Sequence, residues 1–113
     1  MNDVLTVVTP WWRELLEARV VLETSPTDVT AWDQVRRVAH AIAGNAALVG
    51  LDALAKAARS IERRAIALGE GSPRMDDVWA LDAEREVLGR LMRASGQNAT
   101  GRDDLAGKGD VWR

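Results

Sequence analysis

The chain is long enough for one hydrophobic core, and its composition is that of a folded globular protein: 113 residues, of which 47% are apolar. Its 15 basic and 17 acidic residues are well mixed, which gives no support for a nucleic-acid or membrane surface, and the lack of cysteine excludes thiol chemistry. No apolar run approaches the roughly 18 residues that span a bilayer, and the N-terminus does not have the pattern of a signal peptide. We therefore expect a soluble, cytoplasmic domain.

Thr9 and Pro10 predict the start of a first helix. Threonine is a good helix cap, and a proline at the first helical position loses no hydrogen bond. The apolar stripe that follows is Trp11, Leu15, Ala18, Val21 and Leu22. Residues 1–9, which precede this start, are interpreted as an N-terminal arm or a short helix.

The second and third predicted helices are separated by Gly50. Ser25 and Pro26 repeat the cap-and-proline pattern, with Asp28 near the positive helix end. The second stripe is Val29, Trp32, Val35, Ala39, Ile42, Ala46 and Val49. The third stripe is Leu51, Leu54, Ala57 or Ala58, Ile61, Ala65 and Leu68. Steps of three and four residues in both runs are typical of helices that bury one face.

A fourth helix is predicted to begin at Ser72 and Pro73, with the stripe Val78, Leu81, Val87 or Leu88, Leu91 and Met92. Strand signals are nearly absent, so the fold class is all-α. Four helices with short loops predict an antiparallel four-helix bundle over residues 1–94. Residues 95–113 hold four of the nine glycines and are interpreted as a flexible tail or linker, with Trp112 exposed on it.

His40 is the only histidine, and the helical period places it midway along the second helix, turned away from the stripe. Its neighbours at three- and four-residue spacing are Arg36, Arg37, Gly44 and Ala47. A glycine inside a helix costs about 1 kcal/mol relative to alanine. We expect Ala43, Gly44 and Ala47 to keep the surface beside the imidazole flat, so that another protein can approach it, while the arginines attract an anion.

Seven residues from the histidine onward form a spaced motif: His40, Ile42, Gly44, Gly50, Leu54, Ile61 and Glu62. This pattern resembles the signature of histidine-containing phosphotransfer (HPt) domains of bacterial two-component and phosphorelay systems. The resemblance extends more loosely over residues 10–94, because the family fold is a four-helix bundle with the histidine on the second helix. It implies that His40 is phosphorylated, and that the Glu62 carboxylate accepts a hydrogen bond from its Nδ1 and orients it.

One position departs from the family pattern, because the lysine expected three residues after the histidine is Ala43 here. By resemblance, that lysine steadies the phosphoryl group. Candidates to replace it are Arg36 and Arg37 on the second helix, and Lys56 and Arg59 on the third. The alternative interpretation is that each of these four residues is an ordinary solvated charge. Glu62 has the alternative of pairing with Arg59 or Arg63.

The resemblance implies a phosphocarrier that relays a phosphoryl group between a histidine kinase or a receiver aspartate and a response-regulator receiver domain. No glycine-rich phosphate loop or acidic magnesium cluster is visible, so we expect no cofactor, no metal and no ATP-dependent kinase activity of its own, with Mg²⁺ supplied by the receiver. We expect a monomer that binds neither nucleic acid nor membrane. Two alternatives stay open: a degenerate scaffold that binds a signalling partner without phosphotransfer, and the HPt module of a larger, chemotaxis-type kinase.

Overall fold

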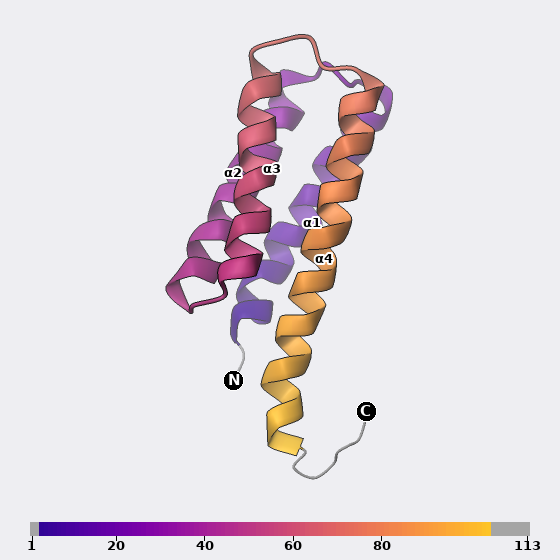
Figure 1. The fold of residues 1–113 in the computed structure, drawn as a ribbon. Helices are drawn as coiled ribbons and strands as arrows, with labels where there is room; N and C mark the ends of the chain where they lie inside the picture. Colours follow the sequence, from indigo (N-terminus) through magenta and orange to yellow (C-terminus); the bar gives the residue numbers. More distant parts are fainter. Residues whose placement is uncertain (1–2, 105–113) are drawn as a thin grey trace.

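Four helices run side by side in alternating directions, and they confirm the predicted all-α bundle (Figure 1). The computed structural model describes the backbone of residues 3–104 and the side chains of residues 9–95. Within this part of the chain there is no strand. The helices are α1 (Asp3–Thr24), α2 (Val29–Leu48), α3 (Asp52–Gly69) and α4 (Met75–Asp104).

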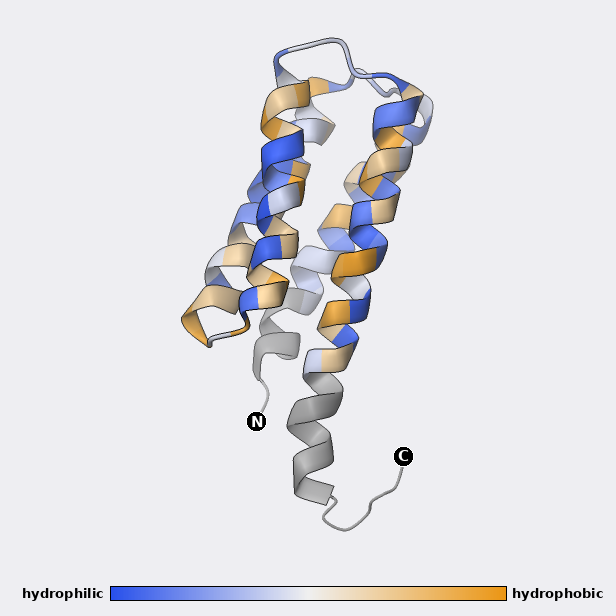
Figure 2. Cartoon of the chain, in the orientation of Figure 1, coloured by the Kyte–Doolittle hydropathy of each residue, from blue (hydrophilic) through white to orange (hydrophobic). Residues whose placement is uncertain are grey.

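The core lies between the apolar faces of all four helices. Figure 2 shows hydrophobic and hydrophilic residues in alternation along each helix, as expected of helices that bury one face. Trp32 is the largest fully buried side chain, and its indole N–H donates to the Pro26 carbonyl at 2.7 Å. The buried apolar residues among the described side chains are Leu15, Ala18, Leu22, Ala31, Trp32, Val35, Val38, Ala39, Ile42, Ala43, Ala46, Leu54, Ala55, Ala58, Ile61, Ala65, Val78, Leu81, Leu88 and Met92.

The predicted stripes are confirmed at their centres and wrong at some outer positions. Val21, Val29 and Val49 are exposed, and of the two alternatives Val87 and Leu88 the buried one is Leu88. Val29 and Val49 flank the ends of α2, where the bundle no longer covers them. A regular apolar spacing therefore identifies the buried face but not how far along each helix the neighbours reach.

The predicted starts of the first and second helices are wrong. α1 already begins at Asp3, so Pro10 lies inside the helix instead of opening it. α2 begins later than Ser25: the Ser25 carbonyl accepts from the Asp28 N–H across a turn, and Asp28 is the cap. Its carboxylate accepts from the Ala31 N–H at 2.9 Å, which satisfies a donor that the first turn of a helix leaves unpaired.

The fourth helix also differs at both ends from its prediction. It begins at Met75 rather than next to Ser72, and the Asp77 carboxylate accepts from the Arg74 N–H at 2.8 Å, as in one half of a capping box. At its other end it continues to Asp104, so residues 95–104 are helical where a tail or linker was predicted. Residues 105–113, including Trp112, lie outside the described part.

The contact between α1 and α4 includes a charged pair as well as apolar residues. The Arg19 guanidinium donates to both oxygens of Asp82, at 2.6 and 2.8 Å. This hydrogen bonding lowers the pKa of the Asp82 carboxyl, against the opposing effect of burial. The pair joins the first helix to the last, and its geometry is the two-pronged one that guanidinium and carboxylate favour.

Replacement of Asp82 by asparagine is expected to lower the free energy of unfolding at pH 7 by about 1 kcal/mol, because a partly exposed pair is screened by water. A carboxyl whose pKa is lower in the folded state stabilises the fold above its unfolded pKa, about 4, and loses this contribution as the pH falls through the folded pKa. The difference from wild type should therefore shrink in acid. Urea unfolding at pH 7 and pH 3 measures it, with Glu86→Gln, an exposed change on α4, as the control. An equal deficit at both pH values would contradict the role of this pair.

Candidate functional site at the exposed histidine

His40 lies on α2 with its ring in solvent, and it is held by one hydrogen bond to the neighbouring helix. Its side chain is 73% exposed, whereas that of Glu62 on α3 is only 19% exposed. The His40 Nδ1 is 2.8 Å from Oε2 of Glu62. The hydrogen bond that the family resemblance implies is thus present, between residues 22 positions apart in the chain.

The close approach of α2 and α3 explains why these two side chains meet. Small side chains in the contact allow two helix axes to come near each other. The alanines that these two helices bury are Ala31, Ala39, Ala43, Ala46, Ala55, Ala58 and Ala65. Across this contact, Glu62 at the edge of α3 reaches the imidazole of His40 on the outer face of α2.

The hydrogen bond prepares the imidazole for nucleophilic attack. A carboxylate oxygen can only accept, so Nδ1 is the donor and carries the proton of the neutral ring. The Nε2 atom then keeps its lone pair, and the hydrogen bond fixes the tautomer and the orientation of the ring. The arrangement therefore provides an oriented nucleophilic nitrogen, which phosphoryl transfer to histidine requires.

The surface beyond His40 is only partly as predicted. Gly44 and Ala47 are exposed, and a Cβ added to Gly44 would meet no atom within 4 Å. Ala43, however, is 2% exposed and belongs to the core, so its inclusion in the flat docking surface is wrong. It comes three residues after His40, which turns it toward α3 rather than toward solvent.

Arg36 and Arg37 both form ion pairs with one carboxylate, that of Asp33, which was not among the predicted site residues. Asp33 accepts from the Arg36 Nη2 at 2.8 Å and from the Arg37 Nε at 3.1 Å. These bonds, that of Arg36 first, lower the pKa of the Asp33 carboxyl. The signal was the spacing, because an acid three and four residues before two arginines lies on their side of the helix. Both guanidinium groups are thereby held toward the start of α2, while His40 lies in the following turn.

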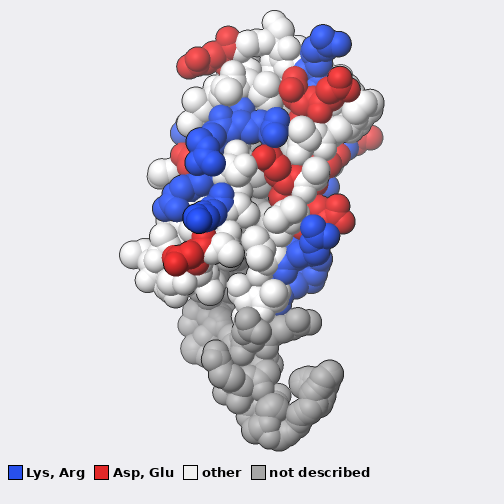
Figure 3. Space-filling model, viewed as in Figure 1, with Lys and Arg blue, Asp and Glu red and all other residues white. Residues whose placement is uncertain are grey.

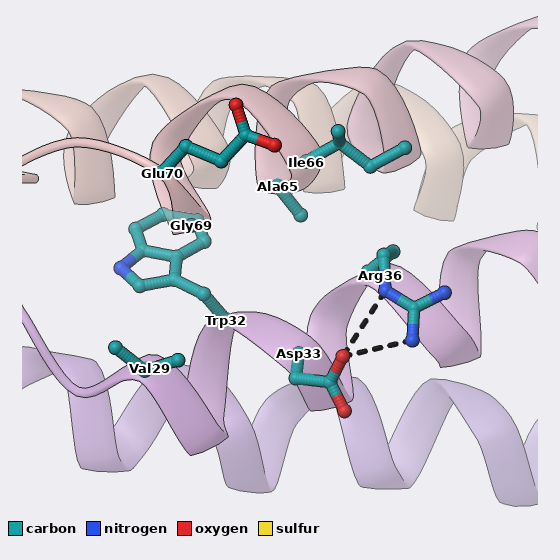
Figure 4. Close-up of a pocket in the computed structure, with 8 residues that line it drawn as sticks. All are labelled: Val29, Trp32, Asp33, Arg36, Ala65, Ile66, Gly69 and Glu70. Carbon is teal, nitrogen blue, oxygen red and sulfur yellow. Dashed lines mark hydrogen bonds and ion pairs between the residues drawn. The ribbon is translucent and has the colours of Figure 1, made fainter.

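A shallow groove of about 230 Å³ lies between the first turns of α2 and the end of α3. Figure 4 shows Val29, Trp32 and Asp33 along one side, with Ile66 and Glu70 opposite, and the bonds from Arg36 to Asp33 across its end. Arg36, which lines this groove, lies one turn before His40 on α2. Of the residues that line the groove, only Arg36 was predicted as a site residue, since a groove is formed by the packing of two helices.

Lys56 and Arg59 lie on α3 and are exposed. Within the described part of the chain, neither has a hydrogen-bond or ion-pair partner, in contrast to Arg36 and Arg37. Figure 3 shows lysine and arginine side chains gathered on the face of the molecule that α3 forms. The predicted alternative pairing of Glu62 with Arg59 or Arg63 is absent among the described contacts, because the Glu62 carboxylate is bound to His40.

No group of three or more histidine, cysteine or acidic side chains within the described residues is arranged to hold a metal ion. None of the helices in that part is both long and apolar enough to cross a membrane.

The helical bundle and its exposed, carboxylate-bound histidine define the class of protein. A family model described as the Hpt domain matches residues 7–94, which is more than half of the chain. The chain belongs to the Hpt domain family, whose members are phosphotransfer-type signalling modules that act with kinases and response regulators in phosphorelays. No match was found among curated proteins or among solved structures.

Replacement of Glu62 by glutamine is expected to slow phosphorylation of the chain by about tenfold to a hundredfold, the usual cost of losing a residue that orients a reactive histidine. The amide can still accept a hydrogen bond, but it lacks the negative charge that stabilises the positive charge developing on the ring during attack. The initial rate of label transfer from a phosphorylated receiver measures the effect, with Glu17→Gln, an exposed change on α1, as control. Equal rates for the variant and wild type would show that the hydrogen bond has no role in transfer.

Proposed function

We propose that this chain relays a phosphoryl group between a histidine kinase or a receiver aspartate and a response-regulator receiver domain, with His40 as the carrier. The observation that carries the proposal is the exposed imidazole whose Nδ1 is hydrogen-bonded to Glu62. An exposed ring is accessible to a partner, and the hydrogen bond directs the reactive lone pair of Nε2 outward. Membership of the Hpt domain family supports the same role.

The proposed step is an in-line displacement at phosphorus. The Nε2 lone pair of His40 forms the new N–P bond while the P–O bond to the receiver aspartate breaks, and the carboxylate leaves with the electron pair. Glu62 stabilises the positive charge that develops on the ring. The receiver would hold the Mg²⁺ that neutralises the phosphoryl oxygens, and transfer onward to a receiver would be the same step in reverse.

The phosphocarrier would be cytoplasmic and monomeric. It would bind no cofactor of its own and would have no ATP-dependent kinase activity. Its partners would be a histidine kinase and a receiver domain, not nucleic acid or membrane. The chain would act either by itself or as the HPt module of a larger kinase. In both cases the reactive surface is the His40 face of α2.

A second candidate function is a scaffold that binds a signalling partner without accepting phosphoryl. Ala43 favours it, because the position where the family carries a lysine has a buried alanine here. A receiver charged with radiolabelled acetyl phosphate distinguishes the two. Label that moves to the chain supports the carrier, whereas a complex that forms while the chain stays unlabelled supports the scaffold.

A further inference from the structure

Arg59 lies at the level of the missing lysine, on the opposite helix. His40 and Glu62 face each other, and α2 and α3 run in opposite directions (Figure 1). Three residues forward from His40 on α2 reach Ala43, and three residues back from Glu62 on α3 reach Arg59. Both steps move about 4.5 Å along the helix axes in the same direction, so Ala43 and Arg59 share one level of the bundle.

Arg59 is also turned toward the histidine more than its basic neighbours on α3. At about 100° per residue, it lies some 60° around the helix from Glu62, whereas Arg63 lies about 100° and Lys56 about 120° from it. Lys56 is further away along the axis as well. Residues three apart are neighbours on a helix surface, whereas adjacent residues point apart, so among the three cations Arg59 is the one that shares the helix face of Glu62.

The arginines on α2 are less suitable for the same task. Asp33 holds both guanidinium groups one turn before their own positions, whereas His40 lies one turn after them. A phosphoryl group on Nε2 would have to draw them away from a carboxylate that they already neutralise. Arg59 has no such competitor within the described residues, so no existing ion pair is lost when it meets an anion.

We infer that Arg59 neutralises the phosphoryl group carried by His40 and so replaces, from α3, the lysine that the family carries at the position of Ala43. The inference rests on the proposed function for its biological setting, but it concerns only phosphohistidine and this chain's own residues. A guanidinium offers several donors to phosphoryl oxygens, and the long side chain of an exposed arginine can extend across the interhelical edge.

The first test loads His40 chemically with phosphoramidate, so that no receiver is needed. A nearby cation favours the dianionic phosphoryl group and lowers its pKa, which the ³¹P resonance reports during a pH titration. Arg59→Gln is expected to raise this pKa by about half a unit, whereas Arg63→Gln should leave it near the wild-type value. Both variants lose one positive charge from exposed positions on α3, so the comparison isolates position.

The second test measures how phosphoryl distributes between a receiver and the chain at equilibrium. Arg59→Gln should shift this equilibrium roughly tenfold toward the phosphorylated receiver, as expected for loss of one charge-assisted hydrogen bond. Arg59→Lys should restore most of the phosphoryl on the chain. The same phosphoryl pKa in Arg59→Gln and Arg63→Gln would overturn the inference. A larger shift of that pKa in Arg36→Gln than in Arg59→Gln would overturn it too. A wild-type chain that takes no label from any receiver would instead contradict the proposed function, and the phosphoramidate titration would still decide the role of Arg59.

Discussion

Replacement of His40 by glutamine is expected to abolish phosphoryl acceptance while the bundle stays folded. Glutamine has no nitrogen lone pair able to attack phosphorus, and the chain contains no other histidine. Since the imidazole is largely exposed, its loss removes no core packing. The expected result is no acid-labile label above background after incubation with a radiolabelled phospho-receiver, with a thermal unfolding midpoint close to that of wild type.

A control variant and a contradicting outcome make this result specific to the site. Gln34→Ala, a change on the same helix, should accept label as wild type does, because Gln34 bonds to the Glu14 carbonyl of α1 and not to the histidine. Label on the His40→Gln variant at the wild-type rate would place the phosphoryl group on another residue. That outcome would remove the phosphocarrier proposal.

The second large effect is expected at Gly44, where stability and transfer should change in opposite directions. Gly44 is exposed on α2, one turn beyond His40, and an added Cβ would meet no atom within 4 Å. Gly44→Gln should therefore leave stability equal or raise it by roughly 0.5–1 kcal/mol, because glycine is the poorer helix former. A partner that must bring its aspartate to Nε2 would meet the new side chain, so transfer should fall by tenfold or more, on the order of 1.4 kcal/mol in the barrier.

The unfolding midpoint and the transfer rate should be measured on the same Gly44→Gln preparation. Ala83→Gln, an exposed change on α4, is the matched control, and it should alter neither quantity much, because α4 packs against α1 and α3 and not against the helix that carries His40. A stable Gly44→Gln protein with the wild-type transfer rate would show that partners do not dock on this face. Loss of transfer together with loss of stability would mean that Gly44 has a structural role that its surroundings do not indicate.

The helical bundle was predictable because its signals are local. Apolar residues three and four positions apart indicate a buried face, and the centres of all four predicted stripes are buried. Helix ends were less predictable, since several polar residues near each start can act as the cap. Asp28 rather than Ser25 caps α2, because its carboxylate reaches the Ala31 N–H. Such a choice depends on backbone conformation, which residue types alone do not determine.

Some residues of the candidate site were predictable from the sequence, and others were not. His40 and Gly44 were identified from their place on the outer face of one helix, and Glu62 from the resemblance to the HPt signature, in which each of the three has a fixed offset. Spacing did not show that Ala43 is buried, because burial depends on which side of α2 faces α3.

By itself the sequence determined the fold class and the place of His40 midway along the second helix, since these depend on residue types and their periodic order along single helices. The class of chemistry was implied by the resemblance to the HPt signature. Only the tertiary structure decided which charge of the neighbouring helix meets the histidine. Asp33 holds Arg36 and Arg37 within one helix, at a spacing visible in the sequence, whereas Glu62 holds His40 across two helices. The antiparallel register of α2 and α3 then sets Arg59 beside the level of Ala43. The physical reason is that a helix specifies its own faces through local spacing, whereas contacts between helices depend on their rotation and register, which the packing of the whole core determines.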